Sequence, residues 1–138
     1  MTELPLEGAQ TPDVPSLDLF SLEGKNILIT GGSRGIGAAM AIALAQAGAS
    51  ICLAQNNTSN TSTANAITKL GRKATILPCN LKDIEQAKAI FGQALAVMDD
   101  RIDVLVNCGG LLQRKDSTDI TEEDWDNVCP VDHVSELR

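Results

Sequence analysis

The stretch "ITGGSRGIG", Ile29–Gly37, runs from β-branched residues into a turn with spaced glycines and then into an alanine-rich segment. A strand that turns directly into a helix needs positions without a Cβ wherever the backbone is crowded or a ligand approaches it. Gly31 permits the tight turn, Gly35 lets backbone N–H groups approach a phosphate, and Gly37 lets the first helical turn pack against the strand. The stretch therefore predicts a helix N-terminus that binds an anion.

The glycine spacing is G-x-x-x-G-x-G, which differs from two better known phosphate-binding patterns. Met40 stands where the third glycine of G-x-G-x-x-G would fall, and the G-K-S/T ending of a P-loop is missing. The second difference disfavours nucleoside triphosphate hydrolysis, while the strand–turn–helix context favours nucleotide binding. A methyltransferase that binds S-adenosylmethionine, which has a similar turn, stays open as an alternative, as does a plain glycine turn.

Apolar strands and helical segments alternate on both sides of this turn. We predict strands at Asn26–Thr30, Ser50–Ala54, Ala74–Cys79 and Asp103–Cys108. We predict helices at Ala38–Ala47, at Asp83–Met98 and from Thr121 through Val128, and one further helix of about two to three turns that ends near Leu70–Gly71. Such alternation predicts βαβ crossovers and a parallel sheet with helices on both faces. Right-handed crossovers give the strand order 3-2-1-4 of a doubly wound, Rossmann-type α/β fold, truncated after its fourth strand.

The helix at Asp83–Met98 is amphipathic, and its apolar residues recur every three or four positions. We expect this face to be buried, and it consists of Ile84, Ala87, Ile90, Phe91, Ala94, Leu95 and Met98.

Three segments follow from composition. Residues 1–23, with Pro5, Pro12 and Pro15, are expected to form an N-terminal arm, and residues 24–128 a partial nucleotide-binding domain. Residues 129–138 are expected to form a divergent tail, because Pro130 should interrupt the preceding helix.

Charge and hydropathy exclude several classes of partner. Residues 99–138 contain eleven acids and four bases, which accounts for the whole net charge of −7, and no basic stripe exists. Nucleic acid and anionic membranes are therefore not expected partners. No apolar run approaches the ~20 residues of a membrane span, and no secretory signal is recognisable, so we expect a cytoplasmic protein.

The cysteines do not form a metal-binding pattern. Cys52, Cys79, Cys108 and Cys129 lie far apart, and His133 is the single histidine, so no metal site is expected. Cys52 and Cys79 fall in apolar runs and are expected to be buried and unreactive.

Two motifs carry a resemblance to a known family. "TGGSRGIG", Thr30–Gly37, resembles the T-G-x-x-x-G-x-G cofactor motif of short-chain dehydrogenases/reductases, and "LVNCGG", Leu105–Gly110, is similar to their N-N-A-G motif. Gly109–Val128 further resembles the 2-deoxy-D-gluconate 3-dehydrogenase branch, whose members act on a keto group of a sugar acid. The resemblance implies a dinucleotide partner and NAD(P)-dependent oxidoreduction of a sugar acid or a related alcohol or ketone.

Carried over by position, the resemblance implies a set of cofactor-binding residues. Asn80 takes the place of the family's Asp near the adenine, and Asn107 matches the first Asn of N-N-A-G, where a backbone tie between strands is the alternative role. The full set is Gly31, Ser33, Arg34, Gly35, Ile36, Gly37, Gln55, Asn80, Leu81, Asn107 and Gly109.

The choice between NAD and NADP depends on the end of the second strand. An acid there favours NAD, and an arginine favours NADP. This chain has Gln55 and Asn56, which decide nothing, while Arg34 favours NADP slightly because it can pair with the extra phosphate.

The family's catalytic groups have no counterpart in the sequence. The family carries an Asn, a Ser and a Tyr-x-x-x-Lys motif beyond the fourth strand, and this chain contains no tyrosine. No catalytic residue is assigned, and the chain is not expected to turn over substrate by itself. The alternatives are a non-catalytic dinucleotide-binding module, self-associating or associated with an intact paralogue, and a truncated product without function.

Overall fold

A computed structural model describes residues 15, 17–112 and 114–134 of the 138-residue chain. Its centre is a four-stranded parallel sheet of β1 (Asn26–Thr30), β2 (Ser50–Gln55), β3 (Ala74–Pro78) and β4 (Val104–Asn107). The strand order is β3-β2-β1-β4, which confirms the predicted doubly wound topology. β1 therefore lies between β2 and β4, and β4 forms one edge of the sheet.

The two central strands are buried on both faces. Ile27, Leu28 and Ile29 of β1 have no exposed surface, and neither have Ile51, Cys52 and Leu53 of β2. Because side chains alternate along a strand, each strand contributes to two cores. Cys52 and Cys79 are buried, as predicted.

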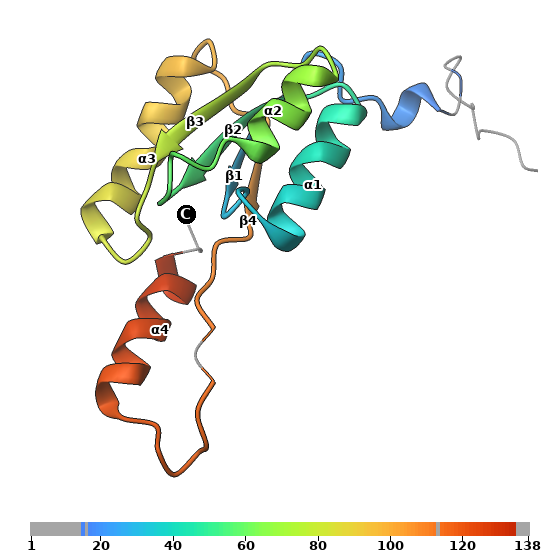
Figure 1. Cartoon of the computed structure of the whole chain (residues 1–138). Helices are drawn as coiled ribbons and strands as arrows, with labels where there is room; N and C mark the ends of the chain where they lie inside the picture. Colours follow the sequence, from blue (N-terminus) through green and yellow to red (C-terminus); the bar gives the residue numbers. More distant parts are fainter. Residues whose placement is uncertain (1–14, 16, 113, 135–138) are drawn as a thin grey trace, which may run out of the picture.

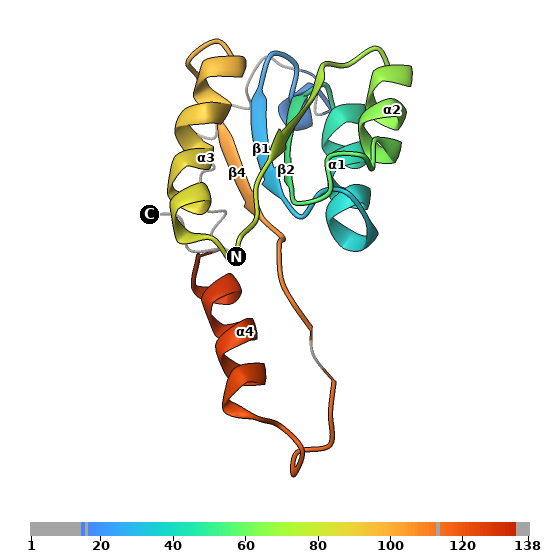
Figure 2. The ribbon, with the colours of Figure 1, turned by 60° about the vertical axis from the view of Figure 1, so that its left-hand side comes forward.

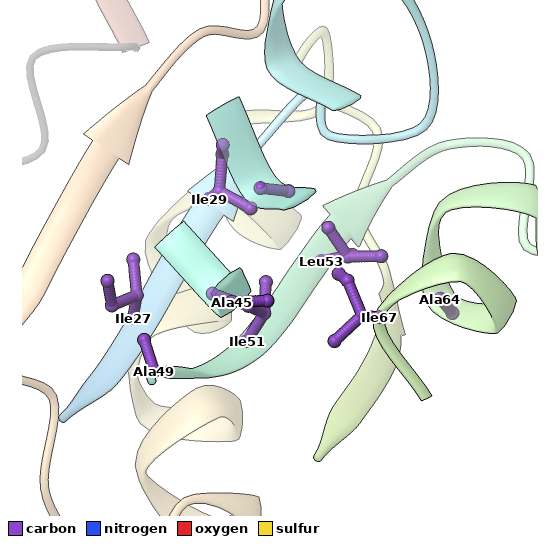
Figure 3. Packing of buried hydrophobic residues seen from close by; sticks show 9 residues of the cluster. Ile27, Ile29, Ala45, Ala49, Ile51, Leu53, Ala64 and Ile67 are labelled. Carbon is purple, nitrogen blue, oxygen red and sulfur yellow. The ribbon is translucent and has the colours of Figure 1, made fainter. Parts of the chain in front are cut away.

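Helices α1 (Gly35–Gln46) and α2 (Ser62–Lys69) cover one face of the sheet, and α3 (Ile84–Val97) covers the other (Figures 1 and 2). The first core packs Ile27, Ile29, Ile51 and Leu53 against Ala41, Ala45 and Ala49 and against Ala64 and Ile67 of α2 (Figure 3). The second core packs Leu28, Cys52, Ala54 and Cys79 against Ile90, Ala94 and Met98. The small residues of α1 let it lie close to the sheet at the point where the glycine-rich turn ends.

The buried face of α3 is narrower than predicted. Ala87, Ile90, Ala94 and Met98 are buried, but Ile84 and Phe91 are 51% and 41% exposed. Among the described residues, α3 is the helix that covers this face, so its flank has no neighbouring helix to pack against. The expectation that Ile84 and Phe91 are buried was wrong for this reason.

Helix α4 (Glu122–Val134) projects from the carboxyl edge of the sheet, away from both cores (Figures 1 and 2). Its backbone stays helical through Pro130, whereas the sequence predicted an end near Val128. A proline in a helix removes one hydrogen bond, and the turns on either side keep theirs. The predicted tail therefore begins as part of α4, and residues 135–138 lie outside the described residues.

The described part of the N-terminal arm contains a short 3-10 turn at Asp18–Phe20. Residues 1–14 and 16 of the predicted arm lie outside the described residues. None of the helices described here has both the length and the apolar character needed to cross a membrane.

Candidate functional site: a cleft at the carboxyl edge of the sheet

A cleft of about 940 Å³ opens where the four strands end and the chain turns into helices. Its position is the topological switch point of the sheet, where ligands bind in open α/β folds. It is lined by Gly31, Ser33, Arg34, Gly35, Ile36, Gly37, Ala54, Gln55, Asn56, Asn57, Asn60, Cys79, Asn80, Leu81, Lys82, Cys108, Gly109, Gly110, Leu111 and Leu112. A cleft of this size is within the range of small-molecule and cofactor sites, roughly 300–1,000 Å³.

The glycine-rich turn is held together by close backbone approaches. Gly31 has φ +69°, and a Cβ there would lie 2.7 Å from the Cα of Gly109. A Cβ at Gly37 would lie 2.4 Å from the carbonyl oxygen of Gly31. Both positions require glycine, as predicted, but the contact with Gly109 joins two motifs that are distant in the sequence.

Gly35 differs from these two because no atom lies within 4 Å of the place where its Cβ would be. Its φ of +56° is left-handed, and it is the first residue of α1. A side chain at this position would therefore enter the cleft rather than the protein. The space beside Gly35 is where a phosphate can approach the backbone.

Thr30 connects the ends of β1 and β4. Its buried Oγ1 accepts hydrogen bonds from the N–H groups of Cys108 and Gly109, at 3.2 and 3.1 Å. These bonds hold the backbone of Gly109 at the end of β1, next to Gly31.

The cleft attracts anions. The N–H groups of Gly35, Ile36 and Gly37 have no acceptor within α1, because they belong to its first turn. Arg34 is the N-cap residue of α1, and Lys82 lies in the loop between β3 and α3 and lines the same cleft. Among the cleft residues that the structure describes there is no carboxylate, although the chain as a whole is acidic. Negative ligands are therefore favoured here.

Amides gather where β2 ends. The Nε2 of Gln55 donates to the carbonyls of Asn57 and Asn60, at 2.7 and 2.8 Å. Its Oε1 is buried and has no hydrogen-bond partner in the described part of the chain. The Nδ2 of Asn60 donates to the carbonyl of Ser33, at 3.1 Å, and so joins this loop to the glycine-rich turn.

Asn80 follows β3 and is held by its own neighbours. Its Oδ1 accepts from the N–H of Lys82 at 3.1 Å, and its N–H donates to the Oε1 of Gln86 at 3.0 Å. Gln86 also donates to Asp83, the N-cap of α3, and hydrogen bonds from Gln86 and Glu85 lower the pKa of this carboxyl group. These bonds fix Asn80 at the edge of the cleft, beside Lys82.

Cys79 lines the cleft at the end of β3, and Cys108 lines it at the end of β4. Burial, followed by the charge of Asp83, raises the pKa of the Cys79 thiol. The Cys79 thiol therefore lines the cleft in its neutral form at physiological pH, and it is not a nucleophile.

Ten of the eleven residues predicted to bind a cofactor line this one cleft, and Asn107 does not. Asn107 is the last residue of β4, lies in register with Thr30 and is exposed. Asn57, Asn60 and Lys82 also line the cleft and were not among the predicted site residues. The rule that loops at the carboxyl ends of neighbouring strands meet would have included them.

Comparison with known proteins agrees with the family resemblance of the two sequence motifs. The family model described as short chain dehydrogenase matches residues 25–137. The 2-dehydro-3-deoxy-D-gluconate 5-dehydrogenase of Escherichia coli K12 is 41% identical over 112 residues, which are 81% of this chain and 44% of that protein. This chain thus spans less than half the length of that relative.

Solved structures agree in fold. A short-chain dehydrogenase/reductase from Mycobacterium marinum superposes with a TM-score of 0.82 at 29% identity, over 88% of this chain and 49% of that one. A short chain dehydrogenase from Burkholderia cenocepacia in complex with NADP gives 0.77 at 30% identity, over 83% and 47%. With the glycine-rich turn, the strand order and the matched residues in agreement, this chain belongs to the short-chain dehydrogenase family.

Proposed function

We propose that this chain binds NAD(P) in the cleft and supplies the cofactor-binding half of an oxidoreductase that acts on a sugar acid or a related alcohol or ketone. The observation that carries the proposal is the lining of the cleft. It combines the free N–H groups at the start of α1 with the cations Arg34 and Lys82, and it contains no carboxylate among the described residues. The open space beside Gly35 fits a pyrophosphate, because no side chain fills it. The sugar-acid substrate class is supported by the relative from Escherichia coli.

Within the proposal, each part of the cleft has its own role. The turn at Gly35–Gly37 and the side chain of Ser33 would hold the pyrophosphate, and Asn80 would meet the adenine. Bound nicotinamide supplies the hydride chemistry. The residues of this chain bind and orient the cofactor.

We further propose that NADP is preferred over NAD. Arg34 is exposed at the N-cap of α1 and can pair with a phosphate on the adenosine ribose. No carboxylate at the end of β2 repels that phosphate, because Gln55 and Asn56 are neutral amides. The NADP-bound relative from Burkholderia cenocepacia supports this preference.

We do not expect these 138 residues alone to catalyse the reaction. A proton must pass to or from the substrate oxygen, and the chain contains no tyrosine to transfer it. Purified protein mixed with NADPH and a keto sugar acid should therefore consume no cofactor. Sustained oxidation of NADPH by the pure chain would contradict this part of the proposal.

Calorimetric titration with NADPH and NADH tests binding. Gly35→Ala and Gly71→Ala form a matched pair, because both glycines have positive φ (+56° and +76°) and open space around the missing Cβ. Both substitutions should cost about 1–2 kcal/mol of stability, because alanine disfavours a left-handed backbone. Gly35→Ala alone should weaken NADPH binding, by about tenfold or more, since hydrogen bonds to charged groups are lost.

Arg34→Gln tests the preference for NADP. The variant should lose affinity for NADPH and keep its affinity for NADH, because only the extra phosphate is affected.

Equal binding of NADPH by the unaltered chain and by Gly35→Ala would contradict the proposed site. An equal loss for both cofactors in Arg34→Gln would contradict the proposed preference.

A further inference from the structure

The loop between β2 and α2 is joined to the glycine-rich turn by a single side chain. The Nδ2 of Asn60 donates to the carbonyl of Ser33 at 3.1 Å, across 27 residues of sequence. That carbonyl shares its peptide group with the N–H of Arg34, the N-cap residue of α1. Asn60 therefore acts on the peptide that directs the start of α1 toward the cleft.

The orientation of the Asn60 amide is determined by its other contacts. Its Oδ1 accepts from the N–H of Ser62 at 3.2 Å and from the hydroxyl of Ser62 at 2.7 Å, at the start of α2. Because the oxygen is used there, the amide nitrogen faces Ser33. A rotated amide would lose all three bonds.

Gln55 holds the backbone of the same loop. It is 3% exposed, and its Nε2 donates to the carbonyls of Asn57 and Asn60. Both hydrogens of that amide are used inside the protein, while its Oε1 stays without a partner in the described part of the chain. A buried side chain with this arrangement keeps the loop in one place.

We propose that Asn60 is a positioning residue for the anion-binding end of the cleft, held in place by Gln55. It fixes the Ser33–Arg34 peptide so that the first turn of α1 and the side chain of Arg34 face the phosphates of the ligand. This inference rests on the proposed binding of a dinucleotide. It extends that proposal to a residue whose side chain acts through the turn and not on the cofactor.

The variant Asn60→Ser separates positioning from folding. A serine hydroxyl can still accept from Ser62 at the start of α2, but it is too short to reach Ser33. The matched control is Asn65→Ser, because Asn65 also lies near the start of α2 and donates its Nδ2 to Thr61 Oγ1 at 3.2 Å, away from the cleft.

Two measurements are made on the unaltered chain and on both variants. In the ligand-free protein, the backbone ¹⁵N resonance of Arg34 should shift in Asn60→Ser and stay in place in Asn65→Ser, because its peptide has lost a hydrogen bond. Titration with NADPH should show a Kd raised about three- to tenfold in Asn60→Ser, the effect of one hydrogen bond, and unchanged in Asn65→Ser. The melting temperatures of the two variants should agree.

The outcomes distinguish this inference from the proposed function. An unmoved Arg34 resonance in Asn60→Ser overturns the inference, whatever the binding result. An unchanged Kd for NADPH in Asn60→Ser, beside clear binding by the unaltered chain, also overturns it and leaves the proposed function standing. Failure of the unaltered chain to bind either NADPH or NADH overturns both together.

Discussion

Asn26 and Asp103 are bonded to each other through two hydrogen bonds. The N–H of Asn26 donates to the Oδ2 of Asp103 at 2.8 Å, and the N–H of Asp103 donates to the carbonyl of Asn26, also at 2.8 Å. The side chain of Asn26 further donates to the carbonyls of Met98 and Arg101, at 2.7 and 3.0 Å. The start of β1 is thereby joined to the turn that leads into β4.

Asn26→Ala should destabilise the protein, because the carbonyls of Met98 and Arg101 lose their donor. We expect a loss of about 1–3 kcal/mol in the free energy of unfolding, measured by urea denaturation. Asn65→Ala is the control, since it removes one exposed amide bond and should change stability little. Equal stability of the two variants would show that the turn before β4 does not depend on Asn26.

Acid should loosen the start of α4. Hydrogen bonds from Lys115, then from the N–H and hydroxyl of Thr121, lower the pKa of Asp124 from 3.8 to about 2. A carboxyl group with a depressed pKa stabilises the folded state fully above its unfolded pKa, and this contribution is lost as pH falls toward the folded pKa. The start of α4 should therefore be unchanged from pH 7 to about 5 and loosen between about pH 4 and 2.

Trp125 reports this change, because it is the single tryptophan of the chain and follows Asp124 directly. Its fluorescence should change between about pH 4 and 2 in the unaltered protein. In Asp124→Asn the step should disappear, since an amide does not titrate in this range. A step of the same size in that variant would assign the transition to other carboxyl groups.

The cysteines should differ in reactivity. Burial raises the pKa of Cys52 to about 11, with a smaller opposing effect from Lys73, whereas Cys108 is only partly buried. Alkylation at pH 8, followed by peptide mass spectrometry, should modify Cys108 well before Cys52, because the thiolate is the reacting form. Unfolding in urea should remove the difference. Similar rates in the folded protein would mean that the second core opens on the timescale of labelling.

The outer edge of β4 should promote self-association. β4 pairs with β1 on one side, and Val104 is 38% exposed at the other edge of the sheet. Exposed strand edges pair with other chains, and lysine at an edge discourages this. Val104→Lys should lower the apparent mass in light scattering, whereas Leu70→Lys, an exposed apolar residue at the end of α2, should not. The same mass for the unaltered chain and Val104→Lys would exclude this edge as the contact.

The strand order and the glycine-rich turn were determined by local features of the sequence. Apolar runs such as Ile27–Ile29 specify strands that are buried on both faces, and the chirality of crossovers then limits their order. The local part of the need for glycine comes from the left-handed φ of Gly31 and Gly35 and from the carbonyl of Gly31 beside Gly37, all within a few residues of backbone.

Only the tertiary structure decided which distant residues meet. The approach of Gly31 to Gly109 and the bond from Asn60 to Ser33 depend on where separate loops end after the sheet has formed, and no sequence period encodes this. The exposure of Phe91 likewise depends on what covers the flank of α3. Local residue preference also failed at Pro130, where the helix continues to Val134 because one missing hydrogen bond does not outweigh the bonds on either side of it.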